Sequence, residues 1–257
     1  MMTNAIADAW YMVLRDLKAR VRMPVFVFMS LFQPILWLVL FTQIFKSLGG
    51  TPGIGGSTYL QFFAPGVLVM TVLFGSAFAG FGMLWDKDMG ILSKMLATPV
   101  TRVSIIGGRV IATVIVLLIQ ALIILVISII MGVNIVTGVP GALFVLLLLF
   151  LLGLGFAAFS NGLALLLKRQ ENVMAVTNLL TMPLMFLSSM LMPPDLLPGW
   201  LNIVRHFNPV DYAIVGVRDL ITQGYVWSDL WLSLVVLLAV ALAGIAFGTL
   251  MFRARAE

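Results

Sequence analysis

The chain of 257 residues contains no cysteine and a single histidine, His206. Without cysteine there are no disulfides, no thiol chemistry and no cysteine metal sites, and one histidine cannot form a histidine metal cluster by itself. Charged residues are also scarce, at 10% of the chain, where an ordinary globular domain has roughly 25%. These shortages exclude thiol enzymes and metal sites built from cysteines or from several histidines, and they indicate a protein that lies in a membrane.

What the chain has in abundance is long apolar runs, since hydrophobic residues make up 62% of it. Several runs reach the ~20 residues that a helix needs to cross a bilayer. Backbone polar groups in lipid must be paired within their own segment, so these runs predict helices and an all-α fold. We expect one polytopic domain over residues 1–257, with six transmembrane helices near residues 25–45, 59–84, 104–132, 141–167, 172–192 and 230–252.

Basic residues are distributed unevenly between the two sides that six spans create. Only Lys46, Arg205 and Arg218 fall on one side, and the other 12 of the 15 basic residues fall on the side of the two termini. The positive-inside tendency therefore predicts that both termini are cytoplasmic. We expect Arg109, near the inner end of the third span, to snorkel out to water. Residues 1–22 are charged and no small-residue cleavage site follows the first run, so we expect this run to remain as a span.

Residues 5–22 have the pattern of an amphipathic helix. Apolar side chains recur at helical spacing, while charged ones fall mostly elsewhere; the apolar set is Trp10, Val13, Leu14, Leu17 and Val21. This pattern favours a helix that lies on the inner membrane surface. The alternative is a solvated helix that only satisfies the orientation rule.

A charged stretch, WDKDMGILSKMLATPVTR at residues 85–102, separates the second span from the third. Met89, Leu92 and Leu96 share one helical face, and Pro99 ends the pattern. We expect a short cytoplasmic helix over about residues 86–97. At roughly three turns it is too short to be stable alone in water, so its apolar face must lie on the headgroup layer or on another protein.

Between the fifth and sixth spans, residues 193–229 are too polar to span a membrane and too apolar for a free loop. Prolines interrupt the segment, at Pro198 and Pro209 among others. We expect two short helices within about residues 196–225 that dip into the outer leaflet as re-entrant helices, because irregular backbone at that depth is tolerated only against protein or a wet cavity. An amphipathic lid resting on the surface is the alternative.

The sequence offers no constellation for catalysis. None of the five lysines follows a glycine, so no phosphate-binding loop is present, and there is no His-Glu-x-x-His motif. Ser160 and Asn161 in the fourth span have no base nearby in the sequence pattern, so we interpret them as a polar pair that packs helices or faces a substrate. Any energy for work must come from another chain.

Five stretches in order carry a family resemblance: LFQPILWLVLF at 31–41, YLQFFAPGVL at 59–68, WDKDMGILSKMLATPVTR at 85–102, FLSSMLMPPDLLPGWL at 186–201 and NPVDYAIVGVR at 208–218. With these stretches the chain resembles the permeases of the ATP-binding-cassette (ABC) type 2 exporter family. It is most similar to the branch typified by daunorubicin-resistance and nodulation-factor export permeases. The resemblance covers nearly the whole chain.

The resemblance implies roles for particular residues. The cytoplasmic helix becomes a coupling helix seated in a groove of a separate ATPase subunit, with coupling residues Asp88, Gly90, Leu92, Met95, Leu96 and Pro99. The helix of residues 5–22 is similar to the interface helix of the family, through Trp10, Leu14 and Leu17. Asp88 and Ser189 depart from the usual family residues, which are commonly Glu and Gly.

The same resemblance implies an assembly. We expect two ATPase subunits, which bind ATP and Mg while this chain holds no cofactor, and a second permease copy, giving a homodimer. The substrate path would lie between the permeases, lined from the first and fifth spans by Gln33, Phe41, Asn178, Thr181 and Met185. Ordinary helix packing is the alternative for each of these five.

The resemblance further implies export of a hydrophobic or amphiphilic compound, a drug or a lipid-like molecule, across the plasma (inner) membrane of a prokaryote. Export of a lipid-linked glycan or polysaccharide by the same mechanism is one alternative. An intramembrane enzyme and a channel are two others, and nucleic acid is not an expected partner.

Overall fold

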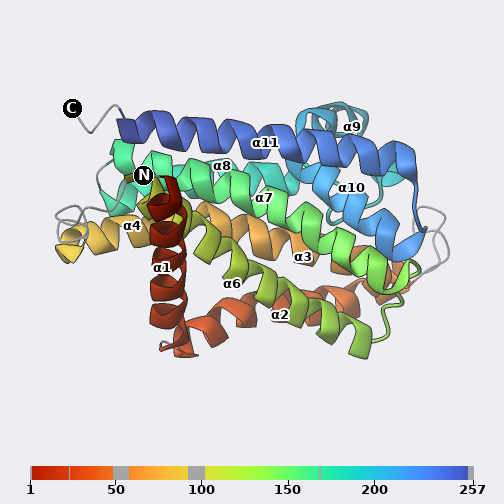
Figure 1. The fold of residues 1–257 in the computed structure, drawn as a ribbon. Helices are drawn as coiled ribbons and strands as arrows, with labels where there is room; N and C mark the ends of the chain where they lie inside the picture. Colours follow the sequence, from red (N-terminus) through yellow and green to blue (C-terminus); the bar gives the residue numbers. More distant parts are fainter. Residues whose placement is uncertain (1, 23, 49–57, 92–101, 168, 254–257) are drawn as a thin grey trace.

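The computed structural model describes residues 2–22, 24–48, 58–91, 102–167 and 169–253, and these contain helices and no strands (Figure 1). The helices are α1 (Met2–Val21), α2 (Pro24–Ile44), η1 (Lys46–Leu48), α3 (Tyr59–Ala77), α4 (Ala79–Asp88), α6 (Arg102–Ile130), α7 (Gly138–Leu167), α8 (Gln170–Phe186), η3 (Pro194–Leu196), α9 (Gly199–Val204), η4 (Arg205–Phe207), α10 (Pro209–Thr222) and α11 (Trp227–Arg253). The expectation of an all-α fold is confirmed for this part of the chain.

Four helical stretches are long and apolar enough to cross a bilayer: Tyr59–Asp86, which joins α3 and α4, Ser104–Ile130, Gly138–Leu167 and Trp227–Met251. The chain is therefore a multi-pass membrane protein. α2 contributes a shorter apolar stretch, Phe28–Ile44, and α8 has 17 residues. The count of six spans stays a prediction.

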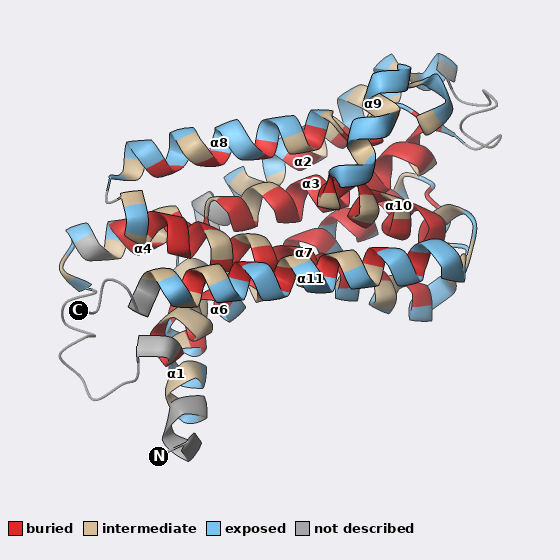
Figure 2. Ribbon diagram, turned by 90° about the horizontal axis from the view of Figure 1, so that it is seen from above, coloured by how far each residue is buried: buried red, intermediate tan, exposed pale blue. Residues whose placement is uncertain are grey.

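The core of the bundle lies around α3. This helix is apolar on all sides, as expected of a helix that is surrounded by others. In the apolar stretch Tyr59–Asp86 that begins with α3, 72% of the most apolar 18 residues are buried. Phe63, Leu68 and Leu73 are fully buried, and Leu148 and Leu152 of α7 pack in the same cluster. In Figure 2 α3 is drawn almost wholly as buried, whereas α8 exposes its outer face along most of its length. α3 is thus a fixed central element.

α7 and α11 pack more extensively than any other pair of helices that the structure describes. Small residues bring the two backbones together, as in many membrane helix pairs. A Cβ added to Gly155 would lie 2.9 Å from the carbonyl oxygen of Val240, and one at Gly248 would lie 2.8 Å from that of Ala158. One added to Gly244 would collide with the carbonyl of Gly155. We call this contact the glycine seam: Gly155, Gly162, Gly244 and Gly248.

α1 runs crosswise to the long helices, against the end of α6 that follows the charged stretch (Figure 1). Gly108 permits this contact, because a Cβ there would lie 2.7 Å from the carbonyl oxygen of Ala9 and from Cβ of Met12. The far end of α4 and the last turns of α11 lie at the same end of the bundle (Figure 1). α1 thus lies across the spans, and its position along the plane of a membrane stays a prediction.

Candidate functional site

One charged residue at the end of the second span, Asp86, forms a network with charged residues of α1 and α6. We call it the ion network: Arg15, Asp16, Asp86 and Arg109. Arg109 Nη2 of α6 donates to Asp86 Oδ2 of α4 at 2.6 Å and to the carbonyl oxygen of Gly82 at 3.0 Å. Arg15 of α1 lies 3.3 Å from the same Asp86 oxygen and 2.9 Å from Asp16. Arg109 Nε completes the set, 3.9 Å from Asp16 Oδ2.

The ion network corrects the expectation that Arg109 snorkels to water. Its side chain is largely buried and turns inward to Asp86, because a carboxylate and the backbone carbonyl of Gly82 together satisfy the guanidinium better than the helix surface does. Three helices that are distant in sequence are tied at one point. The end of α4 therefore cannot move without moving α1 or α6, or breaking these bonds.

Arg20 gives α1 a second attachment to α6. Its Nη2 donates to Thr113 Oγ1 at 2.9 Å. Burial lowers the pKa of the Arg20 guanidinium, and the nearby Asp16 carboxylate opposes that shift. Val13 is buried on the same side of α1, whereas Trp10 and Leu14 are exposed and Leu17 is half-buried. Of the three expected interface-helix residues, two thus point away from the bundle, and their contact with a membrane stays a prediction.

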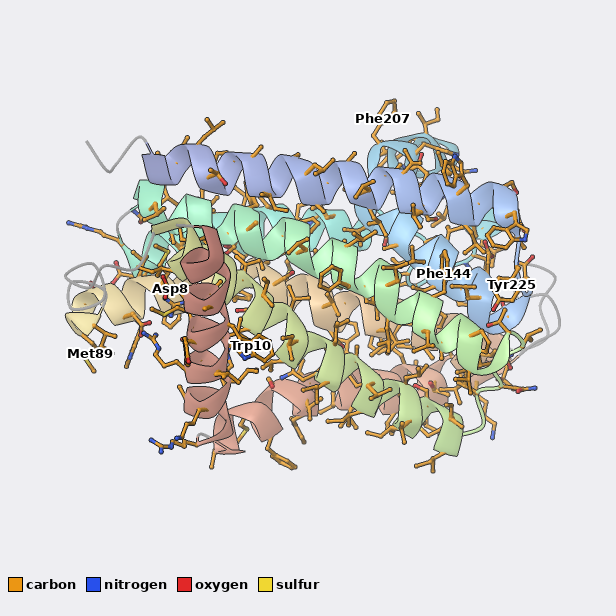
Figure 3. All side chains as sticks on the ribbon, in the orientation of Figure 1. Asp8, Trp10, Met89, Phe144, Phe207 and Tyr225 are labelled. Carbon is orange, nitrogen blue, oxygen red and sulfur yellow. The ribbon has the colours of Figure 1, made fainter. Side chains whose placement is uncertain are left out.

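α4 ends at Asp88, beyond the residue 86 at which the sequence pattern begins a new helix. Asp88 Oδ2 accepts a hydrogen bond from Gln170 Nε2 of α8 at 2.7 Å. Gly90 has φ of 69°, a left-handed conformation that glycine adopts without strain and that breaks the helix here. Figure 3 places Met89 at the exposed tip of α4. Leu92, Met95, Leu96 and Pro99, the other expected coupling residues, lie outside the described residues.

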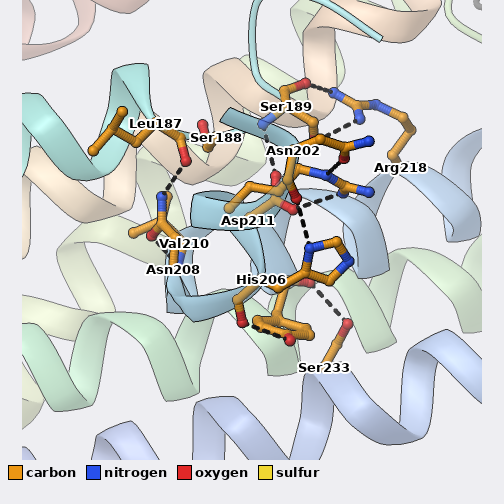
Figure 4. Close-up of polar contacts among 12 residues, drawn as sticks. Leu187, Ser188, Ser189, Asn202, His206, Asn208, Val210, Asp211, Arg218 and Ser233 are labelled. Atoms are coloured by element: carbon orange, nitrogen blue, oxygen red, sulfur yellow. Dashed lines mark hydrogen bonds and ion pairs between the residues drawn. The ribbon is translucent and has the colours of Figure 1, made fainter. Parts of the chain in front are cut away.

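At the opposite end of the bundle, α10 begins at a well-capped turn (Figure 4). Asn208 Oδ1 accepts from the N–H of Val210 at 3.0 Å, and its Nδ2 donates to the carbonyl oxygens of Leu184 and Leu187 at the end of α8. Asp211 Oδ1 accepts from the N–H of Ser189 at 2.6 Å, and its Oδ2 lies 3.0 Å from Arg205 Nη1. These bonds fix α10 to the turn that follows α8.

Arg218 of α10 is the most enclosed cation among the residues described. It donates to the carbonyl oxygens of Phe62 at 3.3 Å and of Ser189 at 2.7 Å, and to Ser189 Oγ at 3.2 Å. Its Cζ lies 3.9 Å from the centre of the Phe62 ring, a cation–π contact. Burial lowers the pKa of Arg218 to about 10, and Asp211 and Asp219 oppose that shift. The serine that departs from the family pattern thus serves as an additional acceptor.

Asp219, the neighbour of Arg218, is buried with one oxygen unpaired. Its Oδ1 accepts from Gln223 Nε2 at 3.3 Å, and its Oδ2 has no hydrogen-bond partner. The pKa of Asp219 is raised to about 6, chiefly by burial and also by the carboxylate of Asp229, while Arg218 opposes the shift. This carboxyl group therefore carries a proton more readily than an exposed aspartate.

Short helices occupy the segment that was expected to hold re-entrant helices. α9 and η4 carry exposed apolar side chains, and Phe207 is 85% exposed and points away from the bundle in Figure 3. Trp200 and Ile203 are exposed as well. An apolar face without a protein neighbour fits a position in lipid, and the dip into the outer leaflet stays a prediction.

The five expected path residues are not gathered in one place. Gln33 of α2 and Asn178 of α8 are exposed. Phe41 instead stacks on Trp37, with 4.5 Å between ring centres, and on Phe63 at 5.5 Å.

The other two expected path residues lie within the bundle. Thr181 is buried and donates to the carbonyl oxygen of Thr177 at 2.8 Å, and Met185 is part of the core. Of the five, Gln33 and Asn178 are thus exposed on the surface of the single chain, and the path role of all five stays a prediction.

The ion network is the feature that sequence reasoning missed. Its members were read only as markers of orientation, because they lie on three separate elements. A weak signal was present: Asp16 interrupts the basic run of residues 15–22, and Asp86 lies at the predicted start of the charged cytoplasmic helix. The sequence positions of Asp16 and Asp86 do not indicate which basic residue each one pairs with.

The sequence is similar to a known family of transporters and to permeases of other organisms. A family model described as ABC-2 type transporter matches residues 8–222. The ycf38 protein of Cyanophora paradoxa, which is named as a transport permease, is 33% identical over 200 residues, covering 77% of this chain and 69% of the relative.

Several relatives carry names of drug resistance. The daunorubicin resistance ABC transporter permease protein DrrB1 of Streptomyces coeruleorubidus is 24% identical over 82% of this chain and 74% of its own length. The linearmycin resistance permease protein LnrN of Bacillus subtilis is 28% identical over 73% of this chain and 47% of its own length.

Proposed function

Because the chain belongs to the ABC-2 type transporter family, we propose that it is the membrane-embedded permease subunit of an ATP-driven exporter. A separate ATPase subunit binds ATP and Mg and supplies the energy, since this sequence has no phosphate-binding loop. The family match over residues 8–222 is the observation that carries the proposal. The drug-resistance names of two relatives support a hydrophobic or amphiphilic cargo, a drug or a lipid-like compound.

The proposed contact with the ATPase is the stretch that begins at the tip of α4. Asp88 and Gly90 lie where α4 leaves the bundle, and the ion network ties the last turns of α4 to α1 and α6. A force applied at the tip would therefore reach two other helices directly. A rigid element with such connections suits the transmission of ATP-driven movement.

The proposed orientation places this end of the bundle in the cytoplasm of a prokaryotic cell, with α1 along the inner surface of the plasma membrane. The basic residues of α1 and the α4 stretch support it by the positive-inside tendency. α9 and α10 then lie at the outer leaflet, where the exposed apolar side chains of α9 meet lipid.

The proposed assembly has two permease copies and two ATPase subunits, with the cargo path between the permeases. The exposed Gln33 and Asn178 are the candidates for facing that path, on α2 and α8. Because the native chain has no cysteine, Gln33→Cys provides a clean crosslinking probe. A crosslink between two copies supports the homodimer, and its absence under all nucleotide conditions contradicts a path at α2.

Co-purification tests the class of protein most directly. We expect an ATPase subunit to be retained by the wild-type chain and lost with Leu92→Asp, which places a charge in the predicted apolar seat. The variant should still insert into the membrane. Wild-type transport by Leu92→Asp would contradict the coupling assignment, and nucleotide-independent flux through the chain alone in liposomes would indicate a channel.

A further inference from the structure

The span that leads to the charged stretch is broken at Phe78. α3 ends at Ala77, α4 begins at Ala79, and Phe78 between them has φ of −86° and ψ of 3°. The N–H of Phe81 donates to the carbonyl oxygen of Phe78, three residues back, at 3.1 Å. In a continuous helix that N–H would bond to the carbonyl of Ala77. The break therefore leaves a backbone carbonyl without its usual partner inside a membrane span.

Ser160 of α7 fills the break. Its Oγ accepts a hydrogen bond from the N–H of Gly80 at 3.0 Å and donates to the carbonyl oxygen of Ala77. Thr177 of α8 donates to the same carbonyl at 3.4 Å. Both side chains are buried. Lipid offers no water to satisfy open backbone groups, so neighbouring hydroxyls are what make such a break tolerable.

The approach of α4 to α7 is adapted to this contact. Gly80 has no side chain, and a Cβ there would collide with the backbone carbonyl of Ser160. The serine and the glycine thus form a pair, one supplying the hydroxyl and the other the space. Position 78 itself is a phenylalanine, but glycines lie nearby at positions 75, 80 and 82, so the contact with α7 and the space left by Gly80 together account for the position of the break.

The two halves of the span are held differently. α3 is enclosed by the core on all sides. α4 has an exposed edge at Trp85, which is 50% exposed, and its tip is the start of the charged stretch. A half enclosed by the core (α3), a hydrogen-bonded break, and a half that has an exposed edge and is joined to α1 and α6 by the ion network (α4) together have the form of a hinge.

We propose that Phe78 is a hinge in this span and that Ser160 is its positioning residue. The inference rests on the proposed function: α4 tilts relative to α3 when the ATPase moves the stretch that follows it. The Ser160 hydroxyl keeps the open backbone groups of Ala77 and Gly80 bonded, so the bend stays at one place. Without the hydroxyl, the span either regains its unbroken hydrogen-bond ladder and moves as one rigid helix, or it bends at several positions. In both cases less of the movement of α4 is confined to Phe78.

Spin-label distances on the reconstituted complex of permease and ATPase test the hinge. The chain has no native thiol, so Trp85→Cys on α4 can be paired with Leu242→Cys on α11, which is 60% exposed. Thr58→Cys, at the exposed start of α3, paired with Leu242→Cys is the matched control. We expect ATP to shift the distance between positions 85 and 242 and to leave the distance between 58 and 242 unchanged.

The variant Ser160→Ala should reduce the shift at position 85 and lower transport per ATP hydrolysed by more than about fivefold, the lower end of typical coupling between sites. Thr177→Val, which removes only the second donor, should have a smaller effect on the same ratio. This ratio separates a positioning role from a loss of folded protein, because less folded protein lowers transport and ATP hydrolysis together.

Equal shifts at positions 58 and 85 would overturn the hinge, as would a wild-type ratio in Ser160→Ala, and both results leave the proposed function intact. If Ser160→Ala does not assemble, the two label pairs in the otherwise native chain decide the matter alone. A wild-type chain that retains no ATPase contradicts the proposed function, and the hinge falls with it.

Discussion

Asp86 of α4 and Arg109 of α6 are joined by a hydrogen-bonded ion pair of 2.6 Å, at the point where the second span leaves the bundle. Both side chains are largely buried, so the pair is screened less than one on an open surface. Removing one partner leaves the other charge poorly compensated. The pair is thus a strong local constraint on α4.

A double-mutant cycle measures that constraint. We expect Asp86→Asn and Arg109→Gln each to lower the unfolding free energy in mixed micelles by about 1–3 kcal/mol. The two losses should not add, with an interaction energy of at least about 0.5 kcal/mol. Glu171→Gln, on the exposed side of α8, is the control and should be neutral. Additive losses from the two variants would show that the pair contributes no coupling.

Arg218 should not be replaceable by lysine. Lysine keeps the charge but not the planar fork that reaches Ser189 and the carbonyl of Phe62 at once. We expect Arg218→Lys to cost more than about 2 kcal/mol of stability. Ser189→Gly removes one acceptor and keeps the carbonyl, so it should cost no more than about 1.5 kcal/mol. Thermal unfolding of both variants in detergent checks the order, and a larger loss in Ser189→Gly would contradict it.

Asp219 should make stability fall as pH rises. Its folded-state pKa of about 6 lies above the value of about 3.9 for an exposed aspartate, so the folded state binds more protons between these values. The unfolding free energy should therefore decrease from about pH 4 to about pH 6, by at most about 3 kcal/mol. Asp219→Asn should remove this slope, whereas Asp195→Asn, at an exposed position, should keep it. A slope that survives in Asp219→Asn assigns the proton to another group.

The glycine seam should not accept a methyl group. At Gly244 a Cβ meets the backbone of Gly155, which cannot rotate away. We expect Gly244→Ala to lower stability by about 1–3 kcal/mol, as overpacking usually does. Leu242→Ala, on the exposed side of the same helix, should change it far less. Unfolding in mixed micelles compares the two, and a neutral Gly244→Ala would mean that α7 and α11 are separable.

Sequence patterns located the long helices because hydrophobic length is set by the bilayer and can be read directly. The helices α6, α7 and α11 each follow an apolar run. The break at Phe78 could not be predicted, since the run from Tyr59 onward is continuous. Pro65 lies inside α3 without ending it. The break depends on a contact between Gly80 and the hydroxyl of Ser160, 80 residues further along the chain, and the apolar run does not indicate that partner.

For the candidate sites, too, the sequence indicated the elements but not their contact partners. Amphipathic spacing identified α1, but its buried side is set by Gly108 and Arg109 of α6, and these belong to another span. The family resemblance suggested Phe41 as a path residue, which stays a prediction; in the structure Phe41 stacks on Trp37 of its own helix and on Phe63 of α3. Residue type indicates which side chains are unusual in a membrane. Partners are set by tertiary contacts.

The crosswise position of α1 has a consequence for biosynthesis. α1 is translated before α6, yet Asp16 and Arg20 of α1 pair with Arg109 and Thr113 of α6. During synthesis the nascent helix must therefore wait at the membrane until the third span has been inserted. α1 can then dock only after α4 and α6 have been inserted, so the first helix to be made is among the last to reach its final position.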